Sequence, residues 1–311
     1  MSFLVERPAD KYNPDAFSAF APNKSSFEIG NAQALMWMSQ LAYETRWPEK
    51  IEKIRALWKL ETATPFSAAA NTILPIARTH GVIATRQDAT IVAFAGTDPL
   101  VVADWVTDFD AFPSPKGLHS GFQLAADVAW SVVEDAVKTR GGRNVVFTGH
   151  SLGGAIAIIS AERVSRELEV TPTSVYTFGS PRPGSEQFAQ QYKSSGPEDR
   201  TFRLVHGTDL VATVPPGKLL NRDTGFRHVG PMLACASGDR FDPARPMTPS
   251  SQNKPDFDES LFQSITDDLQ SLIAGRLFMP VEKGFLGALF GTLPRQIRDH
   301  VPPSYFKALG T

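Results

Sequence analysis

The sequence contains a single cysteine, Cys235, among its 311 residues. One thiol cannot form a disulfide within the chain, and a metal centre built from several cysteines is excluded. No apolar run reaches the roughly 18 residues that a membrane-spanning helix requires, so no transmembrane segment is expected. Positive charge is not in excess, because 31 Lys and Arg are set against 33 Asp and Glu. The basic patch of a nucleic-acid-binding protein is therefore absent, and no nucleic-acid partner is expected.

The N-terminal segment lacks the pattern of a secretory signal. Residues 1–8 have no basic start followed by an apolar core. The chain as given therefore favours a cytoplasmic location, unless a signal was removed or secretion takes another route. Residues 1–27 are polar with scattered Pro and Phe, which predicts an irregular N-terminal arm. No internal repeat is visible, and the length suits one large domain over residues 1–311.

The most informative stretch is GHSLGG at residues 149–154, which contains Ser151. A β-branched run precedes it at residues 144–148, and an apolar run of helical character follows at residues 155–162. Strand, G-x-S-x-G and helix in this order indicate a nucleophile elbow, a sharp turn with no room for Cβ atoms beside the serine. At the start of the helix, free N–H groups would favour a developing oxyanion. A glycine-rich turn with an incidental serine is the weaker interpretation, because all three elements agree.

Other segments alternate between strand and helix patterns around this central strand. Strands are predicted at residues 81–85 and 90–94, which form a hairpin signal, and at 173–178, 201–205 and 226–229. Helices are predicted at residues 31–44, 48–60, 122–139, 185–193 and 261–277. This alternation predicts an α/β fold, with a mostly parallel sheet and helices on both faces.

Serine hydrolysis requires a base that takes the serine proton and a carboxylate that orients this base. Asp209 follows a predicted strand, at the sheet edge where open α/β sheets bind ligands, although it could instead cap a turn. Two histidines, His228 and His300, follow it. His228 lies in a strand-like run, whereas His300 comes shortly before a proline and is expected in an extended or turning segment. A loop can carry an imidazole over the sheet edge, so His300 is the preferred base.

Seven collinear blocks resemble the class 3 lipases, the fungal-lipase-like family of triacylglycerol lipases. They are AFAGT at 93–97, DWVTDF at 104–109, HSGF at 119–122, TGHSLGG at 148–154, TFGSPRPG at 177–184, HGTDLVATVPP at 206–216 and DHVPPSY at 299–305. The resemblance implies an α/β-hydrolase fold with Ser151 as nucleophile, Asp209 as orienting acid and His300 as base. It also implies Thr97 and Leu152 as the oxyanion-hole residues, and it implies no cofactor.

The resemblance further implies that residues 98–113, after Thr97, form a lid helix. This segment has an apolar stripe that would suit a lipid interface but would equally suit core packing; its members are Val102, Trp105, Phe109 and Phe112. Asp104 and Asp108 could suggest a metal pair, but their spacing favours a solvated helix face, and no metal site is predicted.

Two features depart from the family pattern. Ala95 stands where the family usually has an arginine, which affects the bracing of the loop rather than the chemistry. Residues 236–298 form an unmatched insertion before His300. The sequence thus predicts a serine hydrolase of lipid carboxylic esters, with a triacylglycerol lipase or esterase as the first expectation. A phospholipase A1, a short-chain carboxylesterase and a catalytically dead lipase-fold interaction module are the alternatives.

Overall fold

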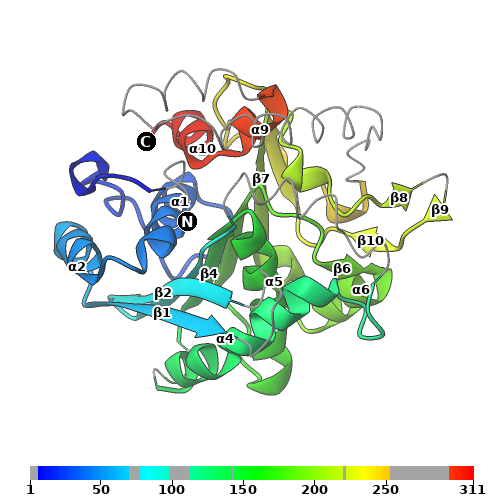
Figure 1. Cartoon of the computed structure of the whole chain (residues 1–311), viewed down its shortest axis with the longest axis horizontal. Helices are drawn as coiled ribbons and strands as arrows, with labels where there is room; N and C mark the ends of the chain where they lie inside the picture. The colour runs from blue at the N-terminus through cyan, green and yellow to red at the C-terminus, as the bar shows by residue number, and fades with distance from the viewer. Residues whose placement is uncertain are drawn as a thin grey trace, which may run out of the picture.

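The computed structural model describes residues 6–69, 78–97, 113–139, 141, 143–219, 222–252 and 294–311. The predicted lid at 98–113 lies outside these residues, apart from its last position. Most of the 236–298 insertion, including the helix predicted at 261–277, also lies outside them. The described residues build a central sheet covered by helices (Figure 1).

The central sheet has seven strands in the order β1-β2-β3-β4-β5-β7-β11. Their bounds are Thr62–Ala69 for β1, Arg78–Arg86 for β2, Ala89–Phe94 for β3, Val145–His150 for β4, Ser174–Phe178 for β5, Thr201–His206 for β7 and Met232–Cys235 for β11. β1, β2 and β3 pair antiparallel, and every pair from β3 to β11 is parallel. The predicted hairpin and the mostly parallel sheet are confirmed. The parallel strands end at one edge, which is where a site is expected.

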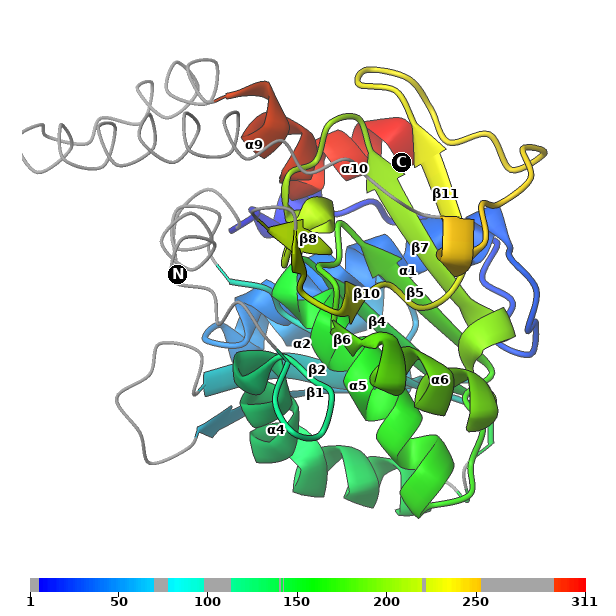
Figure 2. The ribbon, with the colours of Figure 1, turned by 90° about the vertical axis from the view of Figure 1, so that its right-hand side faces the viewer.

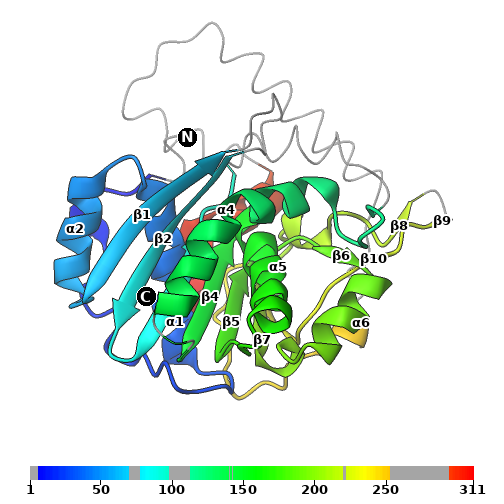
Figure 3. The ribbon, with the colours of Figure 1, turned by 90° about the horizontal axis from the view of Figure 1, so that it is seen from below.

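Helices cover both faces of this sheet (Figure 3). α4 (Ser120–Thr139), α5 (Leu152–Glu167) and α6 (Glu186–Ser194) contribute to one apolar cluster. α1 (Ile29–Leu41), α2 (Pro48–Leu57) and α10 (Pro302–Leu309) contribute to the cluster on the other face. The short helix α9 (Arg295–His300) precedes α10, and both lie close to the carboxyl ends of β7 and β11 (Figure 2). The C-terminal segment is thereby brought to the expected site edge.

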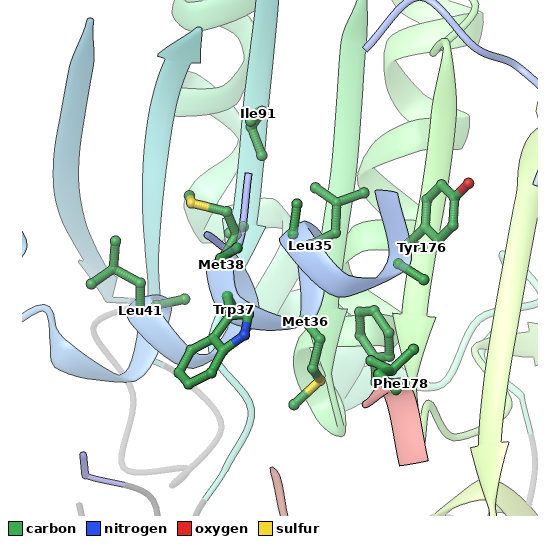
Figure 4. Close-up of a cluster of buried hydrophobic side chains, with 14 of the residues drawn as sticks. Leu35, Met36, Trp37, Met38, Leu41, Ile91, Tyr176 and Phe178 are labelled. Carbon is green, nitrogen blue, oxygen red and sulfur yellow. The ribbon is translucent and has the colours of Figure 1, made fainter. Parts of the chain in front are cut away.

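α1 is buried on nearly its whole circumference. All of its residues except Ile29 and Gln33 are buried. Leu35 and Met38 lie near the strand residue Ile91 (Figure 4), and the indole of Trp37 stacks on Phe306 of α10 with ring centroids 4.0 Å apart. A helix that is packed on several sides needs no polar face, which explains its uniform composition.

Two edge strands were not predicted from the sequence. β1 is mostly exposed and contains Pro65, which lacks the N–H of an inner strand and is tolerated because β1 pairs with β2 alone. β11 has only four residues. Edge strands of this kind carry little of the apolar pattern on which strand prediction depends.

The prediction for residues 226–229 was only partly right. β10 (Phe226–Arg227) pairs with β6 (Gly184–Ser185) in a separate two-stranded sheet and not with the central sheet. A second small sheet joins β8 (Lys218–Leu219) to β9 (Arg222–Asp223). Short 3-10 turns occur at Ala9–Lys11, Ala42–Glu44, Glu198–Arg200, Val211–Thr213 and Ser250–Gln252.

The arm formed by residues 6–27 contains the first of these turns and otherwise no helix or strand. It is anchored by aromatic contacts, since the ring of Phe17 lies 5.2 Å from that of Trp58 and the ring of Tyr12 lies 5.4 Å from that of Trp37. Within the described ranges, no helix is long and apolar enough to cross a membrane.

Candidate active site

Ser151 occupies a strained turn between β4 and α5. Its φ of 59° and ψ of −133° are unusual for a residue with a side chain, and the residue is fully buried. Its N–H donates to the carbonyl of Phe178 on the neighbouring strand at 2.9 Å. The turn is held from both sides, because it is tied to β5 and continues directly into the first turn of α5. The predicted strand–elbow–helix arrangement is confirmed.

Two glycines make this turn possible. A Cβ on Gly149 would lie 2.2 Å from the carbonyl carbon of Gly153, and a Cβ on Gly153 would lie 2.3 Å from the carbonyl oxygen of Phe94. Both distances are far shorter than van der Waals contact, and the obstructing atoms belong to the backbone. The G-x-S-x-G spacing is therefore required by the close approach of β3, β4 and α5.

Asp209 and His300 form a buried pair at the carboxyl edge of the sheet. Nδ1 of His300 lies 2.9 Å from Oδ1 and 3.0 Å from Oδ2 of Asp209. Asp209 lies in the loop after β7, and the N–H of Val211 also donates to its Oδ1 at 2.9 Å. His300 ends α9, so the expectation of an extended segment was wrong at this residue. The restriction before proline acts on Val301, which is extended with ψ of 151°.

Tyr305 is a third member of this buried group that was not singled out from the sequence. Its hydroxyl donates to Oδ2 of Asp209 at 2.7 Å, and it accepts from the N–H of His206 at 3.3 Å. Burial, and then the charge of Asp209, raise the pKa of Tyr305 well above its usual value, so the phenol stays a neutral donor. The only sequence signal was its place in the block DHVPPSY, five positions after His300.

Gly179 was also missed, although it lies against all three of these side chains. Its φ is +59°, and a Cβ there would lie 2.4 Å from Oδ2 of Asp209, 2.9 Å from Nδ1 of His300 and 2.9 Å from the hydroxyl of Tyr305. A side chain at this position would occupy the space that the carboxylate and imidazole share. The glycine after β5 is therefore a requirement of the site and not merely of the turn.

His150 connects the elbow to the segment that carries His300. Burial, and then the proximity of His300, lower the pKa of His150 well below its usual value, which keeps its imidazole neutral. Its Nε2 lies 2.6 Å from the backbone oxygen of His300, and its Nδ1 lies 2.8 Å from the hydroxyl of Tyr43. Because a carbonyl only accepts, Nε2 carries the proton and Nδ1 accepts from Tyr43.

Oγ of Ser151 and Nε2 of His300 are among the buried side-chain atoms that have no hydrogen-bond partner in the described residues. These are the atoms that exchange a proton in a serine hydrolase, and such bonds are often long in the absence of substrate. His228, the other candidate base, donates from Nε2 to the carbonyl of Ala212 at 2.8 Å. The structure thus pairs Asp209 with His300 and gives His228 a different partner.

The two residues implied for the oxyanion hole come from the start of α5 and from the segment after β3. Leu152 is the first residue of α5 and is buried. Thr97 follows β3, and a Cβ on the preceding Gly96 would lie 2.8 Å from Cβ of Ser151, so this segment passes close to the elbow. In the part of the chain that the structure covers, no group of three or more His, Cys, Asp or Glu side chains could hold a metal ion.

Comparison with known proteins finds similarity to lipases. The family model for lipase (class 3) matches residues 91–219, which include the elbow and Asp209. A Rhizopus niveus lipase is 34% identical over 158 residues, covering 47% of this chain and 38% of that protein. The secreted mono- and diacylglycerol lipase 1 of Fusarium solani is 33% identical over 141 residues, covering 42% of this chain and 39% of that protein. The matched region is thus about two fifths of the length of these relatives.

The solved structure of lipase II from Rhizopus niveus superposes with a TM-score of 0.54 at 23% identity. The superposition covers 68% of this chain and 81% of the Rhizopus chain. At this identity the likeness concerns the fold, and it identifies the parallel sheet and its helices as an α/β-hydrolase fold.

Proposed function

We propose that this chain, which the lipase (class 3) family model matches over residues 91–219, hydrolyses carboxylic esters of lipids, with acylglycerols as the substrate class. The observation that carries the proposal is the buried pairing of Asp209 with both its oxygens on Nδ1 of His300, at the sheet edge that also holds the strained Ser151. A carboxylate–imidazole pair that served only packing would not need a strained serine beside it. A serine hydrolase needs all three groups.

In this proposal Oγ of Ser151 attacks the ester carbonyl carbon while Nε2 of His300 accepts its proton. Asp209 holds the opposite ring nitrogen as an N–H donor and stabilises the imidazolium that forms. The imidazolium then protonates the leaving alcohol, and an acyl group remains on Ser151. Water, deprotonated by the same imidazole, releases the fatty acid and regenerates the serine.

The negative oxygen that develops on the ester carbonyl needs hydrogen-bond donors. We propose the backbone N–H groups of Thr97 and Leu152 for this role. Leu152 supports it by its position in the first turn of α5, where backbone N–H groups are free of intrahelical partners. Thr97 supports it by following Gly96, which approaches the Ser151 side chain. Donors aimed at the transition-state oxygen supply a large share of catalysis in such enzymes.

Covalent labelling with a fluorophosphonate tests the chemistry directly. The wild-type protein should be labelled on one serine, and Ser151→Ala should not be labelled at all. Ser160→Ala, which changes another buried serine further along α5, is the matched control and should be labelled like wild type. Absence of labelling in a folded wild-type protein would favour an inactive interaction module and sink the proposal.

A hydrolysis profile then tests the substrate class. We expect turnover of long-chain p-nitrophenyl esters and of emulsified triacylglycerol. A rate confined to short-chain esters would indicate a carboxylesterase, and preferential cleavage of phospholipid would indicate a phospholipase A1.

We further propose that residues 98–113 act as a lid. The rate should then rise sharply at the concentration where the substrate begins to aggregate, and a smooth rise through that concentration would contradict a lid.

A further inference from the structure

A surface cavity lies beside the segment that carries His300 but is lined by different side chains. Its volume is about 250 Å³, and it is bounded by α9, α10, the end of β7 and the turn after β11. The lining side chains that matter here are Arg295, Arg298, Lys307, Asp299, Ser237 and Ser304. Residues that are far apart in the sequence therefore line one cavity.

The charges of this cavity do not balance. Arg295, Arg298 and Lys307 supply three permanent positive charges, and Asp299 is the single carboxylate of the lining. Nε of Arg298 is buried and has no hydrogen-bond partner within the described ranges. Nε of Arg295 lies 3.9 Å from Oδ2 of Asp299, which is too long for a hydrogen bond. The cations are thus gathered in one place without an equal number of anionic groups.

The Asp299 carboxylate already accepts hydrogen bonds from other residues of the protein. Its Oδ2 accepts from the backbone N–H of Thr208 at 2.8 Å, from the Thr208 hydroxyl at 3.0 Å and from the Ser237 hydroxyl. Its Oδ1 lies 3.6 Å from Nδ1 of His206. Burial raises the pKa of Asp299, but these hydrogen bonds outweigh burial and leave the pKa below its usual value. Asp299 consequently acts as a brace for the loop after β7 and leaves the arginines to other partners.

We propose that this cavity binds a phosphate group. Guanidinium groups match the oxygens of phosphate in geometry and charge, and Lys307 adds a third cation. The volume of about 250 Å³ can hold a phosphate group. A phosphate held here would tie α9 to α10. The inference does not depend on the proposed hydrolase activity, because none of these side chains has a role in it.

Thermal unfolding with inorganic phosphate is the primary test, with chloride at equal ionic strength as the reference. A site half-filled near 1 mM should raise the Tm by about 2–4 °C in 10 mM phosphate. The double variant Arg298→Met, Lys307→Met should lose this rise. The matched control is Lys53→Met, Lys193→Met, which removes two exposed charges from α2 and α6 and should keep the rise.

Because Arg298 is partly buried, the exposed single variants Arg295→Met and Lys307→Met guard against a folding defect, and each should reduce the rise. An equal rise in wild type and in these variants, or no rise in wild type, would overturn the proposal.

The same variants identify the source of the phosphate group. Sedimentation with vesicles of phosphatidylcholine, with and without phosphatidic acid, is measured in the Ser151→Ala background so that no lipid is consumed. Retention that requires phosphatidic acid and is lost in Arg298→Met, Lys307→Met assigns the cavity to a lipid headgroup. A phosphate-dependent Tm rise without such retention assigns it to a soluble phosphate compound.

Discussion

The hydroxyl of Tyr305 lies 2.7 Å from Oδ2 of Asp209, and both groups are buried. Asp209 therefore receives donors from three directions, namely Tyr305, the N–H of Val211 and Nδ1 of His300. A buried carboxylate is costly unless its oxygens are satisfied, and each donor restricts the orientation in which it meets the imidazole. We therefore expect Tyr305 to position Asp209, the proposed orienting acid.

Replacing Tyr305 by Phe should lower kcat about tenfold with little change in KM, because it loosens the Asp209 carboxylate without touching substrate. We expect a destabilisation of about 1–3 kcal/mol from the unsatisfied acceptor. Tyr192→Phe is the matched control, since that hydroxyl is also buried and bonded, to Thr201, but lies on α6. It should cost stability and leave kcat unchanged. Equal losses of kcat in both variants would show that Tyr305 serves only the fold.

Gly179→Ala should damage the site more than the fold. The added Cβ would meet the Asp209 carboxylate and the His300 ring, so we expect kcat to fall about 100-fold, as misplacement of catalytic groups by about 1 Å does. Gly141→Ala is the matched control, because Gly141 has a similar φ of +64° and nothing within 4 Å of its added Cβ. Both variants carry the backbone strain of a positive φ, but only Gly179→Ala adds the clash with Asp209 and His300. Urea unfolding and kcat, measured on both variants, therefore separate the two effects. Full activity of Gly179→Ala would contradict this account.

Ser151 offers a test of strain that is stored for function. Both Ser151→Ala and Ser151→Gly should lose activity by a factor of order 10⁶. They should differ in stability, because alanine keeps the unfavourable φ of 59° while glycine relieves it. We expect the glycine variant to be about 1 kcal/mol more stable to urea than the alanine variant. Equal stabilities would mean that the elbow is not strained.

The sequence predicted the elbow, the hairpin and the parallel sheet because each depends on local pattern. The spacing of Gly149, Ser151 and Gly153 records a steric requirement within a few residues, and the structure shows the backbone atoms responsible. The edge strands β1 and β11 were missed because they are exposed or short, so burial leaves little mark on them.

Within the site, the missed residues act over long separations. Gly179 must be a glycine because of the side chains of Asp209 and His300, which are 30 and 121 positions away. Tyr305 bonds the carboxylate of Asp209, which is 96 positions away. No local pattern encodes such contacts. The helical state of His300 was mispredicted for the opposite reason, because a local rule about proline was applied one residue too early.

The two histidines that follow Asp209 should respond differently to mutation. His300→Ala should abolish turnover and leave the fold intact, since it removes the partner of Asp209. His228→Ala should reduce stability and spare most of the activity, because that side chain is buried and bonds the backbone of Ala212. Activity and urea unfolding of both variants decide the matter. A folded, inactive His228→Ala beside an active His300→Ala would reverse the assignment of the base.

Buried neutral histidines should make the protein sensitive to mild acid. Burial is the first cause that lowers the pKa of His228 well below its usual value, and the charges of Arg203 and Arg182 lower it further. Burial and the nearby His300 have the same effect on His150. In the unfolded chain both histidines bind a proton near pH 6.5, while the folded protein does not. The unfolded state therefore gains protons, and stability falls, as the pH drops below about 6.5.

For each such histidine the free energy of unfolding should fall by about 1.4 kcal/mol per pH unit between pH 6.5 and its lowered native pKa. Urea unfolding between pH 8 and pH 5 measures this slope. The amide of His228→Gln can still donate to the Ala212 carbonyl but cannot titrate. This variant should therefore reduce the slope by the contribution of one proton, about 1.4 kcal/mol per pH unit. Its stability relative to wild type should therefore improve steadily below pH 6.5 and stay constant above pH 7.5. Parallel curves for the two proteins would show that His228 does not resist protonation in the folded state.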